Sequence, residues 1–285
     1  MEHQQSDFFA GRTLAIATMH GKEAIIGPIL QSGLGINYIV PSNLNTDDFG
    51  TFSGEIERSN DPLATARLKC KAAADVTGCD MAIASEGSFG PHPSMVFVPC
   101  DDEILVFTDF KNNLEIKVRK ISTETNFGGD LFHDWSSAKT FAEASLFPSH
   151  SLIIRKNKDN SEDTIKGIAS WEDLKSHFEG HITKHGSAFL ETDMRAMCNP
   201  TRRKVIEEAT HKLLQTIKST CPDCSKPGYD IKLARPGLPC SECGAPTAST
   251  YSLLYECMHC AHRSEVKYPH GKNTEDPMYC NYCNP

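Results

Sequence analysis

Eight cysteines near the C-terminal end of the sequence form four Cys-x-x-Cys pairs, a spacing typical of metal ligands. The other four of the 12 cysteines are scattered singly. Each pair presents two thiolates from one tight turn, and two pairs complete the tetrahedron that Zn²⁺ prefers. We therefore predict two structural zinc sites with no open position for a catalytic water. The ligands are Cys221, Cys224, Cys240, Cys243, Cys257, Cys260, Cys280 and Cys283.

The sequence leaves open which pairs share a metal. Joining the first pair to the second and the third to the fourth gives intervals of 15 and 19 residues, which match zinc ribbons. Joining the two middle pairs, or a cross-braced arrangement, is also compatible with the spacing. We expect consecutive pairing, and we expect Gly244 to close its turn in the left-handed conformation.

A second group of residues suggests phosphate chemistry. Lys22 follows one β-prone run and opens a helix, where free main-chain N–H groups and the helix dipole favour an anion. Glu86 follows another β-prone run and enters a segment that Gly87 and Gly90 leave open to a ligand. Because the carboxyl ends of parallel strands meet at one edge of a sheet, we expect both segments to face one crevice holding phosphate and Mg²⁺.

The predicted site contains carboxylates, phosphate-binding side chains and loop residues, and each role follows from the chemistry of the side chain. The alternative is that Glu86 caps a turn and that Lys22 is solvated. The catalytic or metal-binding carboxylates are Glu86 and Asp109, and the phosphate-binding side chains are Lys22, His20, Arg67, Lys69 and Arg202. The loop residues beside them are Gly87, Ser88, Gly90 and His92.

Arg202 begins a run of three cations in the first turn of a predicted helix at 201–217. Cations at that end oppose the helix dipole, which indicates an anion bound nearby. The alternative is that the other two, Arg203 and Lys204, form ordinary pairs with acidic residues one turn later.

An α/β domain must position these residues. Strands at 13–18, 36–40 and 81–85 alternate with helices at 21–30 and 61–76, the pattern of a parallel sheet. Hairpin strands are expected at 96–98, 104–108 and 114–118. The predicted fold is a mixed, mostly parallel sheet with flanking helices, followed by a small double zinc ribbon. The predicted domains are an α/β domain at 1–190, a connecting loop and helix at 191–219, and the ribbons at 220–285.

Composition limits the function classes. The 285 residues carry a formal net charge of −8 and hold enough apolar residues, 39%, to form a core. No apolar run is long enough to span a membrane, and the start lacks a secretory signal, so a cytoplasmic protein is expected. Residues 199–285 carry 11 basic and 9 acidic side chains, a formal net charge of +2. Eight thiolates and two Zn²⁺ together add −4, so the net charge of this region becomes −2. Nucleic acid is therefore not an expected partner.

Several motifs resemble an uncharacterised bacterial domain family with no assigned activity. They are ASEGSFGPHP at 84–93, ETDMRAMCNPTR at 191–202, CPDCSKPG at 221–228, GLPCSECGAPT at 237–247 and the closing CNYCNP. More remotely, the first 90 residues are similar to the inosine/xanthosine triphosphate pyrophosphatases, through Thr18 with Lys22, the run Ala66 to Cys70, and Glu86-Gly87. That resemblance implies Mg²⁺-dependent hydrolysis of nucleoside triphosphates.

Two functions from different classes follow. The first is an α/β phosphohydrolase that acts on a nucleotide or another phosphorylated small molecule with Mg²⁺. The alternative is a non-enzymatic adaptor that binds a small anion and docks a protein partner through its zinc ribbons. RNA binding through the tyrosines of the ribbons is a third and weaker hypothesis.

Overall fold

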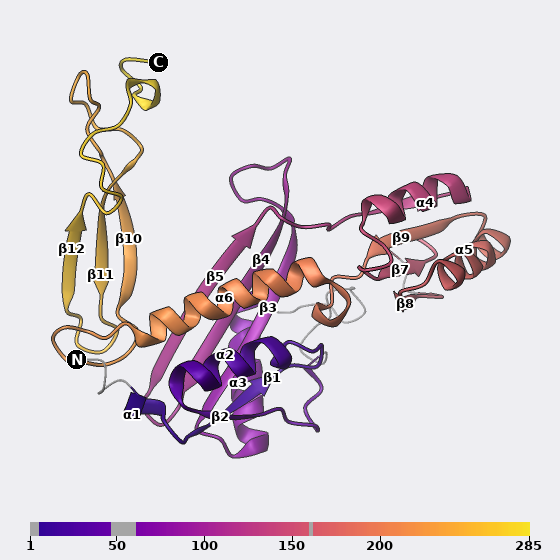
Figure 1. Ribbon diagram of the computed structural model, residues 1–285, viewed down its shortest axis with the longest axis horizontal. Coiled ribbons are helices and arrows are strands. Elements are labelled where there is room, and N and C mark those ends of the chain that lie inside the picture. The colour runs from indigo at the N-terminus through magenta and orange to yellow at the C-terminus, as the bar shows by residue number, and fades with distance from the viewer. Residues whose placement is uncertain (1–5, 47–60, 160–161) are drawn as a thin grey trace. The chain divides into compact units, whose positions relative to one another are not determined.

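The computed structural model describes residues 6–46, 61–159 and 162–285, and the chain forms two compact units, Met1–Leu214 and Gln215–Pro285 (Figure 1). The described residues contain three sheets of five, four and three strands. The first two belong to unit 1 and the third to unit 2. No helix in the described ranges is long and apolar enough to cross a membrane.

The five-stranded sheet has the order β2-β1-β3-β4-β5. Strands β2 and β3 both pair with β1 in parallel, as the alternation of strands and helices predicted. Long antiparallel strands β4 and β5 extend the sheet beyond β3. The bounds are β1 Thr13–Ala17, β2 Asn37–Ile39, β3 Met81–Pro91, β4 Pro99–Asp109 and β5 Leu114–Ser122.

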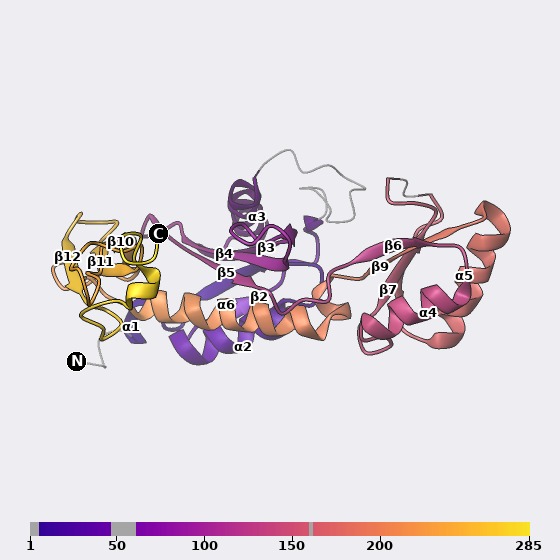
Figure 2. The same cartoon turned by 90° about the horizontal axis from the view of Figure 1, so that it is seen from above.

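Helices cover both faces of this sheet (Figure 2). Helix α3, Pro62–Thr77, begins as predicted, because Asp61 accepts hydrogen bonds from two main-chain N–H groups of its first turn. It packs alanines and Cys70 against small residues of β1 and β3. On the other face lie α2, Glu23–Leu34, and α6, Pro200–Lys218, which touch where Gly33 meets Leu214.

The four-stranded sheet of unit 1 is antiparallel throughout, in the order β6-β9-β7-β8. Two helices pack on it, α4 at Trp135–Ala144 and α5 at Trp171–His185. The alanines of α4 and Leu174 and Phe178 of α5 form a separate core with the strands. The strands are β6 Gly129–Phe132, β7 Leu152–Arg155, β8 Ile165–Ile168 and β9 Ala188–Thr192.

Three short helices among the residues that the structure describes lie outside these sheets. They are α1 Ser6–Phe9, η3 Ala196–Cys198 and, in unit 2, η4 Pro277–Tyr279.

The prediction of a mostly parallel sheet was wrong. Only two of the nine strand pairs among the described residues are parallel, those of β1. Strand β3 does not end at Ser85 as expected, because its main chain continues to pair with β4 through Glu86 and the glycines that follow. A polar or glycine-rich segment can stay in a ladder since the ladder bonds are made by the backbone.

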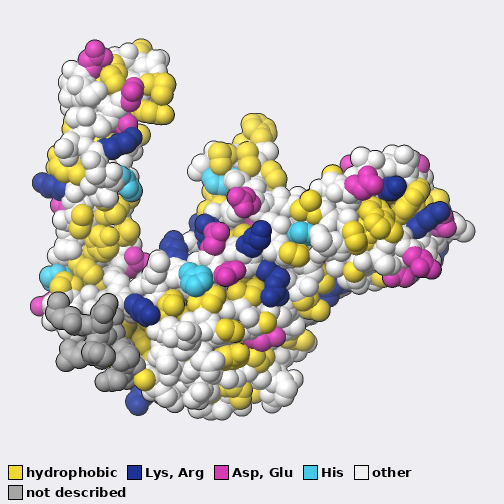
Figure 3. Space-filling view, viewed as in Figure 1, with side chains coloured by type: hydrophobic (Ala, Val, Ile, Leu, Met, Phe, Trp, Pro, Cys, Tyr) yellow, Lys and Arg dark blue, Asp and Glu magenta, His cyan; other side chains and the backbone are white. Residues whose placement is uncertain are grey.

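The segment expected as a strand at 96–98 instead lies in the turn of the β3–β4 hairpin. His92 holds this turn, because its Nδ1 accepts hydrogen bonds from the main-chain N–H groups of Ser94 and Met95. Phe97 at the tip is 98% exposed. Apolar side chains gather at the tip of this hairpin (Figure 3).

Unit 2 contains the antiparallel sheet β10-β11-β12. The bounds are β10 Asp230–Pro236, β11 Thr250–Glu256 and β12 Arg263–Lys267. Most side chains of this sheet are exposed or half-buried, so it has only a small apolar core around Tyr229 and two of the cysteines. A unit of this size with so little apolar burial needs another source of stability.

Candidate metal centres and a buried charged cluster

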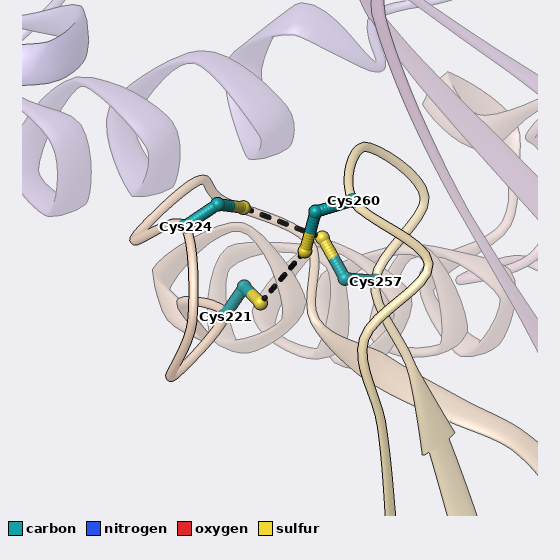
Figure 4. Close-up of side chains that lie close together, drawn as sticks. All are labelled: Cys221, Cys224, Cys257 and Cys260. Carbon is teal, nitrogen blue, oxygen red and sulfur yellow. Dashed lines mark hydrogen bonds between the residues drawn. The ribbon is translucent and has the colours of Figure 1, made fainter.

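The eight paired cysteines converge into two groups of four in unit 2. One group contains Cys221, Cys224, Cys257 and Cys260 (Figure 4), and the other contains Cys240, Cys243, Cys280 and Cys283. Within each group all four sulfur atoms lie within 4.8 Å of one another. Both groups could hold a metal ion.

The sulfur spacing fits a tetrahedral ion. Zn²⁺ binds thiolates at about 2.3 Å, so the sulfurs of a regular tetrahedron stand about 3.8 Å apart. The observed Sγ–Sγ distances are 3.6 Å for Cys221–Cys260 and for Cys224–Cys257. In the second group they are 3.9 Å for Cys240–Cys283 and 3.6 Å for Cys243–Cys280. The donor set and its dimensions therefore suit zinc.

The turns are built to present thiolates. The residue after Cys224, Cys243 and Cys260 has a positive φ in each case, and Gly244, predicted to do so, has φ +72. Main-chain N–H groups point at sulfur atoms, as from His259 to Cys257. Backbone donors from Cys283 and Tyr282 lower the pKa of Cys280 to about 7. This favours the ionised, metal-binding form of Cys280, whereas the neighbouring thiols Cys243 and Cys240 raise the pKa of Cys283 to about 12.

The preferred consecutive pairing was wrong, and the cross-braced arrangement is the one observed. Each strand of unit 2 carries the chain from one end of the sheet to the other, because Asp230 at the start of β10 pairs with Glu256 at the end of β11. The first and third Cys-x-x-Cys pairs therefore lie at one end, and the second and fourth at the other. A seven-residue strand is roughly 20 Å long, so consecutive pairs cannot share one ion.

In unit 1, four ionisable side chains form what we call the buried charged cluster: Lys22, Asp101, Glu103 and Arg202. All are buried, on the face of the sheet that carries α2 and α6. They surround the edge of β3 beyond the point where β1 stops pairing with it, at Ala84. The carboxyl end of β1 thus opens onto this cluster.

Arg202 is held by three different elements. Its Nε donates to Glu103 Oε1 at 2.6 Å, and its Nη1 donates to the main-chain oxygen of Met194. Its guanidinium carbon lies 4.9 Å from the centre of the Phe89 ring. Gly87 permits this packing, because a Cβ there would overlap the guanidinium and lie 2.5 Å from Glu103 Oε1.

Lys22 extends from the start of α2 to β3. Its Nζ donates to Ser85 Oγ at 2.7 Å and to the Ser85 main-chain oxygen at 3.1 Å, and it lies 4.0 Å from Glu103 Oε2. Burial, together with the positive charge of Arg202, lowers the pKa of Lys22 to about 8. The segments around Lys22 and Ser85 therefore meet, as the sequence led us to expect.

The two carboxylates of the cluster differ in their electrostatics. Burial opposes ionisation of Glu103, but the charges of Arg202 and Lys22 hold its pKa below the usual range. Burial and the charge of Glu103 raise the pKa of Asp101 to about 7. Neither carboxylate oxygen of Asp101 has a hydrogen-bond partner in the described part of the chain.

Lys69 and Glu86 lie on the opposite face of the sheet. Side chains alternate along a strand, so Glu86 points to α3 while its neighbours Ser85 and Gly87 point to α2 and α6. Lys69 Nζ lies 2.6 Å from Glu86 Oε1, and both side chains are buried. Their charges still act on Lys22 around the open edge of β3.

Other candidate residues lie apart from the cluster. Asp109 is at the far end of β4, roughly 25 Å from Asp101, where Arg12 binds both of its oxygens. Arg67 is exposed and forms a two-bond pair with Glu115. His20 is half-buried, and its main-chain oxygen accepts from the N–H of Met197. Ser88 is half-buried opposite Asp102, Gly90 has open space around it, and His92 holds the hairpin turn.

The sequence analysis missed Asp101 and Glu103. Asp101 and Asp102 are turn-forming residue types that lie between the strands predicted at 96–98 and 104–108, whereas in the structure they belong to β4. Two acidic residues spaced i and i+2 immediately before a buried apolar run were the available signal, because that spacing puts both on one face of a strand.

Double cysteine variants test the cross-braced pairing. Cys224→Ser with Cys257→Ser removes two ligands of one site, so we expect about half of the zinc to remain. Cys224→Ser with Cys240→Ser removes one ligand from each site, and we expect almost no tightly held zinc. Zinc per chain is measured with a competing chelator dye. Equal zinc contents in the two variants would contradict the observed pairing.

Gly87→Ala should destabilise unit 1 by about 2 kcal/mol, because the new methyl group displaces Arg202 from Glu103. Gly90→Ala, three residues along the same strand, has open space and should change the free energy of unfolding by less than about 0.5 kcal/mol. Urea unfolding of both variants measures the difference. A Gly87→Ala protein as stable as Gly90→Ala would disprove the close approach.

The titration of Asp101 should lower the free energy of unfolding as the pH rises from about 4 to about 7. An unfolded Asp titrates near 3.9, so over that range the native state holds a proton that the unfolded state has lost. Asp101→Asn should flatten this decline by up to about 1.4 kcal/mol per pH unit. Urea unfolding at pH 5 and pH 8, without added divalent cations, measures it. An unchanged pH profile in the variant would refute the raised pKa.

A family model described as a domain of unknown function, DUF6671, matches residues 69–285. The matched region includes all eight paired cysteines and Asp101, Glu103 and Arg202, and it begins after Lys22. No curated protein matches the sequence. The expectation of a domain family without an assigned activity is confirmed: the chain belongs to the DUF6671 family.

Proposed function

We propose that this protein is a zinc protein whose α/β unit binds a phosphorylated small molecule, such as a nucleotide, and hydrolyses a phosphoanhydride bond with the help of a divalent cation. The observation that carries the proposal is the buried charged cluster at the carboxyl end of β1. Ligands of α/β proteins bind at that end of the strands, where helix N-termini also point.

The zinc part of the proposal rests on the two four-cysteine groups. Four thiolates fill the coordination sphere, so the metal would be structural rather than catalytic. It would supply the stability that the small apolar core of unit 2 cannot. Zn²⁺ binding would then be coupled to the folding of that unit.

The phosphate part rests on Lys22 and Arg202. Both are buried, and an arginine fork and a lysine ammonium are suited to phosphate oxygens. Glu86 with Lys69 adds a second charged pair at the same open edge of β3. A divalent cation would neutralise charge on the phosphoryl oxygens. Water would add to phosphorus and the bridging P–O bond would break, with the leaving phosphate keeping the electron pair and the water proton passing to solvent.

The resemblance of the first 90 residues to the inosine/xanthosine triphosphate pyrophosphatases makes nucleoside triphosphates the first substrates to test. Zinc-loaded protein is incubated with a nucleotide panel and Mg²⁺, and release of phosphate and pyrophosphate is measured. Arg202→Gln should lower turnover by roughly 100-fold through lost charge stabilisation. Arg67→Gln is the matched control, because Arg67 pairs with Glu115 outside the cluster, and it should retain full turnover.

Two results would refute the enzyme proposal. One is an absence of turnover across the panel together with no nucleotide-dependent rise in the unfolding temperature. The other is turnover that Arg202→Gln and Arg67→Gln lower equally.

The adaptor function is a second candidate, favoured by the exposed apolar residues beside the last Cys-x-x-Cys pair. Met278 and Tyr279 are more than half exposed, and so is Tyr282. Large exposed aromatic and Met side chains are typical of protein-docking surfaces. A photo-crosslinker at position 282 that captures one defined protein, with no nucleotide turnover by the wild type, would favour this function over the enzyme.

A further inference from the structure

Asp101 and Glu103 lie side by side on one face of β4. They are spaced i and i+2, whereas Asp102 between them points to the other face and pairs with Arg119. Both residues are almost completely buried, since 1% of Asp101 and 0% of Glu103 is exposed to solvent. Two carboxylates thus converge in the interior of unit 1.

Three carboxylate oxygens at this place lack hydrogen-bond donors among the described residues: both of Asp101 and Oε2 of Glu103. Buried carboxylates are ordinarily satisfied by donors or by metal ions, because an unsatisfied one costs several kcal/mol. The nearby cations do not fill this need. Arg202 binds only Oε1 of Glu103, and Lys22 donates to Ser85 and stands 4.0 Å from Oε2.

The charge balance of the cluster permits a cation together with a phosphate. With Asp101 ionised, the cluster has two positive and two negative side chains and is neutral. A divalent cation would bring it to +2, which a phosphate dianion would balance. The atoms that could bind a metal here are all carboxylate oxygens, which suit Mg²⁺ and Mn²⁺ rather than Zn²⁺. Mg²⁺ is commonly held by one or two carboxylates together with water and substrate phosphates.

We propose that Asp101 and Glu103 are the protein ligands of a divalent cation of the Mg²⁺ or Mn²⁺ class, which would bind to their three carboxylate oxygens that lack donors among the described residues, beside the phosphate-binding side chains Lys22 and Arg202. In this assignment Asp101 and Glu103 take the place of Asp109 as the metal-binding acids, whereas Glu86 lies on the opposite face of the sheet with Lys69. Its use in catalysis rests on the proposed function, but binding of the cation alone tests it.

Mn²⁺ is the probe, added to protein whose cysteine sites are already saturated with zinc. Electron paramagnetic resonance of free Mn²⁺ at pH 8 should show one bound ion per chain, displaced by excess Mg²⁺. Asp101→Asn should weaken binding at least tenfold. Asp102→Asn is the matched control, since it removes the same charge one residue away on the other face, and its affinity should stay within twofold of the wild type.

A second measurement needs no variant. Fe²⁺ in place of Mn²⁺, with ascorbate and peroxide, cleaves the main chain beside the bound ion. We expect cuts near 101–103 and on the facing strand near 87–89, abolished by excess Mg²⁺. Absence of Mn²⁺ binding, equal weakening by Asp101→Asn and Asp102→Asn, or cleavage only elsewhere would overturn the assignment.

The outcomes separate the two proposals. Mn²⁺ binding that depends on Asp101, with no nucleotide bound or hydrolysed, would keep the cation site and refute the enzyme. Nucleotide turnover that depends on Arg202, with no Mn²⁺ binding at Asp101, would keep the enzyme and refute this cation site.

Discussion

The contact between Arg202 and Glu103 organises the site in unit 1. It joins the first turn of α6 to β4, two elements about 100 residues apart in the sequence, and it does so in the interior, where a charge needs a partner. Three neighbouring residues accommodate this contact. Gly87 omits a side chain, Phe89 covers the guanidinium, and the main chain before α6 supplies the Met194 oxygen. The three basic residues at the start of α6 therefore have different roles, because Arg202 is buried whereas Lys204 lies on the surface.

The end of β1 explains why charged groups gather there. Since β1 is shorter than β3, the edge of β3 beyond Ala84 has no neighbouring strand on that side among the described residues. Lys22 takes this place and donates to the Ser85 main-chain oxygen. Parallel pairing of β3 with β1 ends at Ala84, where the polar side chains begin, and antiparallel pairing of β3 with β4 continues past that point. A short strand beside a long one thus leaves the edge of the longer strand to polar side chains.

Unit 2 depends on a different constraint, the alternation of chain direction along β10, β11 and β12. Successive Cys-x-x-Cys pairs lie at opposite ends of this small sheet, so each group of four cysteines joins segments more than 30 residues apart. Two such groups hold both ends of a sheet that buries little apolar surface. Metal binding would therefore constrain the whole unit rather than one local turn.

Much of the molecule could be read from local patterns. The four Cys-x-x-Cys pairs predict two metal groups, and Asp61-Pro62 is typical of a helix start such as that of α3. The runs that end before Thr18 and begin at Met81 predict neighbouring parallel strands. All of these signals act between residues that are close in sequence. The partner of each cysteine pair, the length of β3 and the burial of Asp101 and Glu103 were decided by tertiary structure. These features depend on which strand end a segment reaches and on which charges arrive from distant elements. The i, i+2 spacing of Asp101 and Glu103 indicates a shared face of a strand, but no local pattern encodes the cations that meet them there.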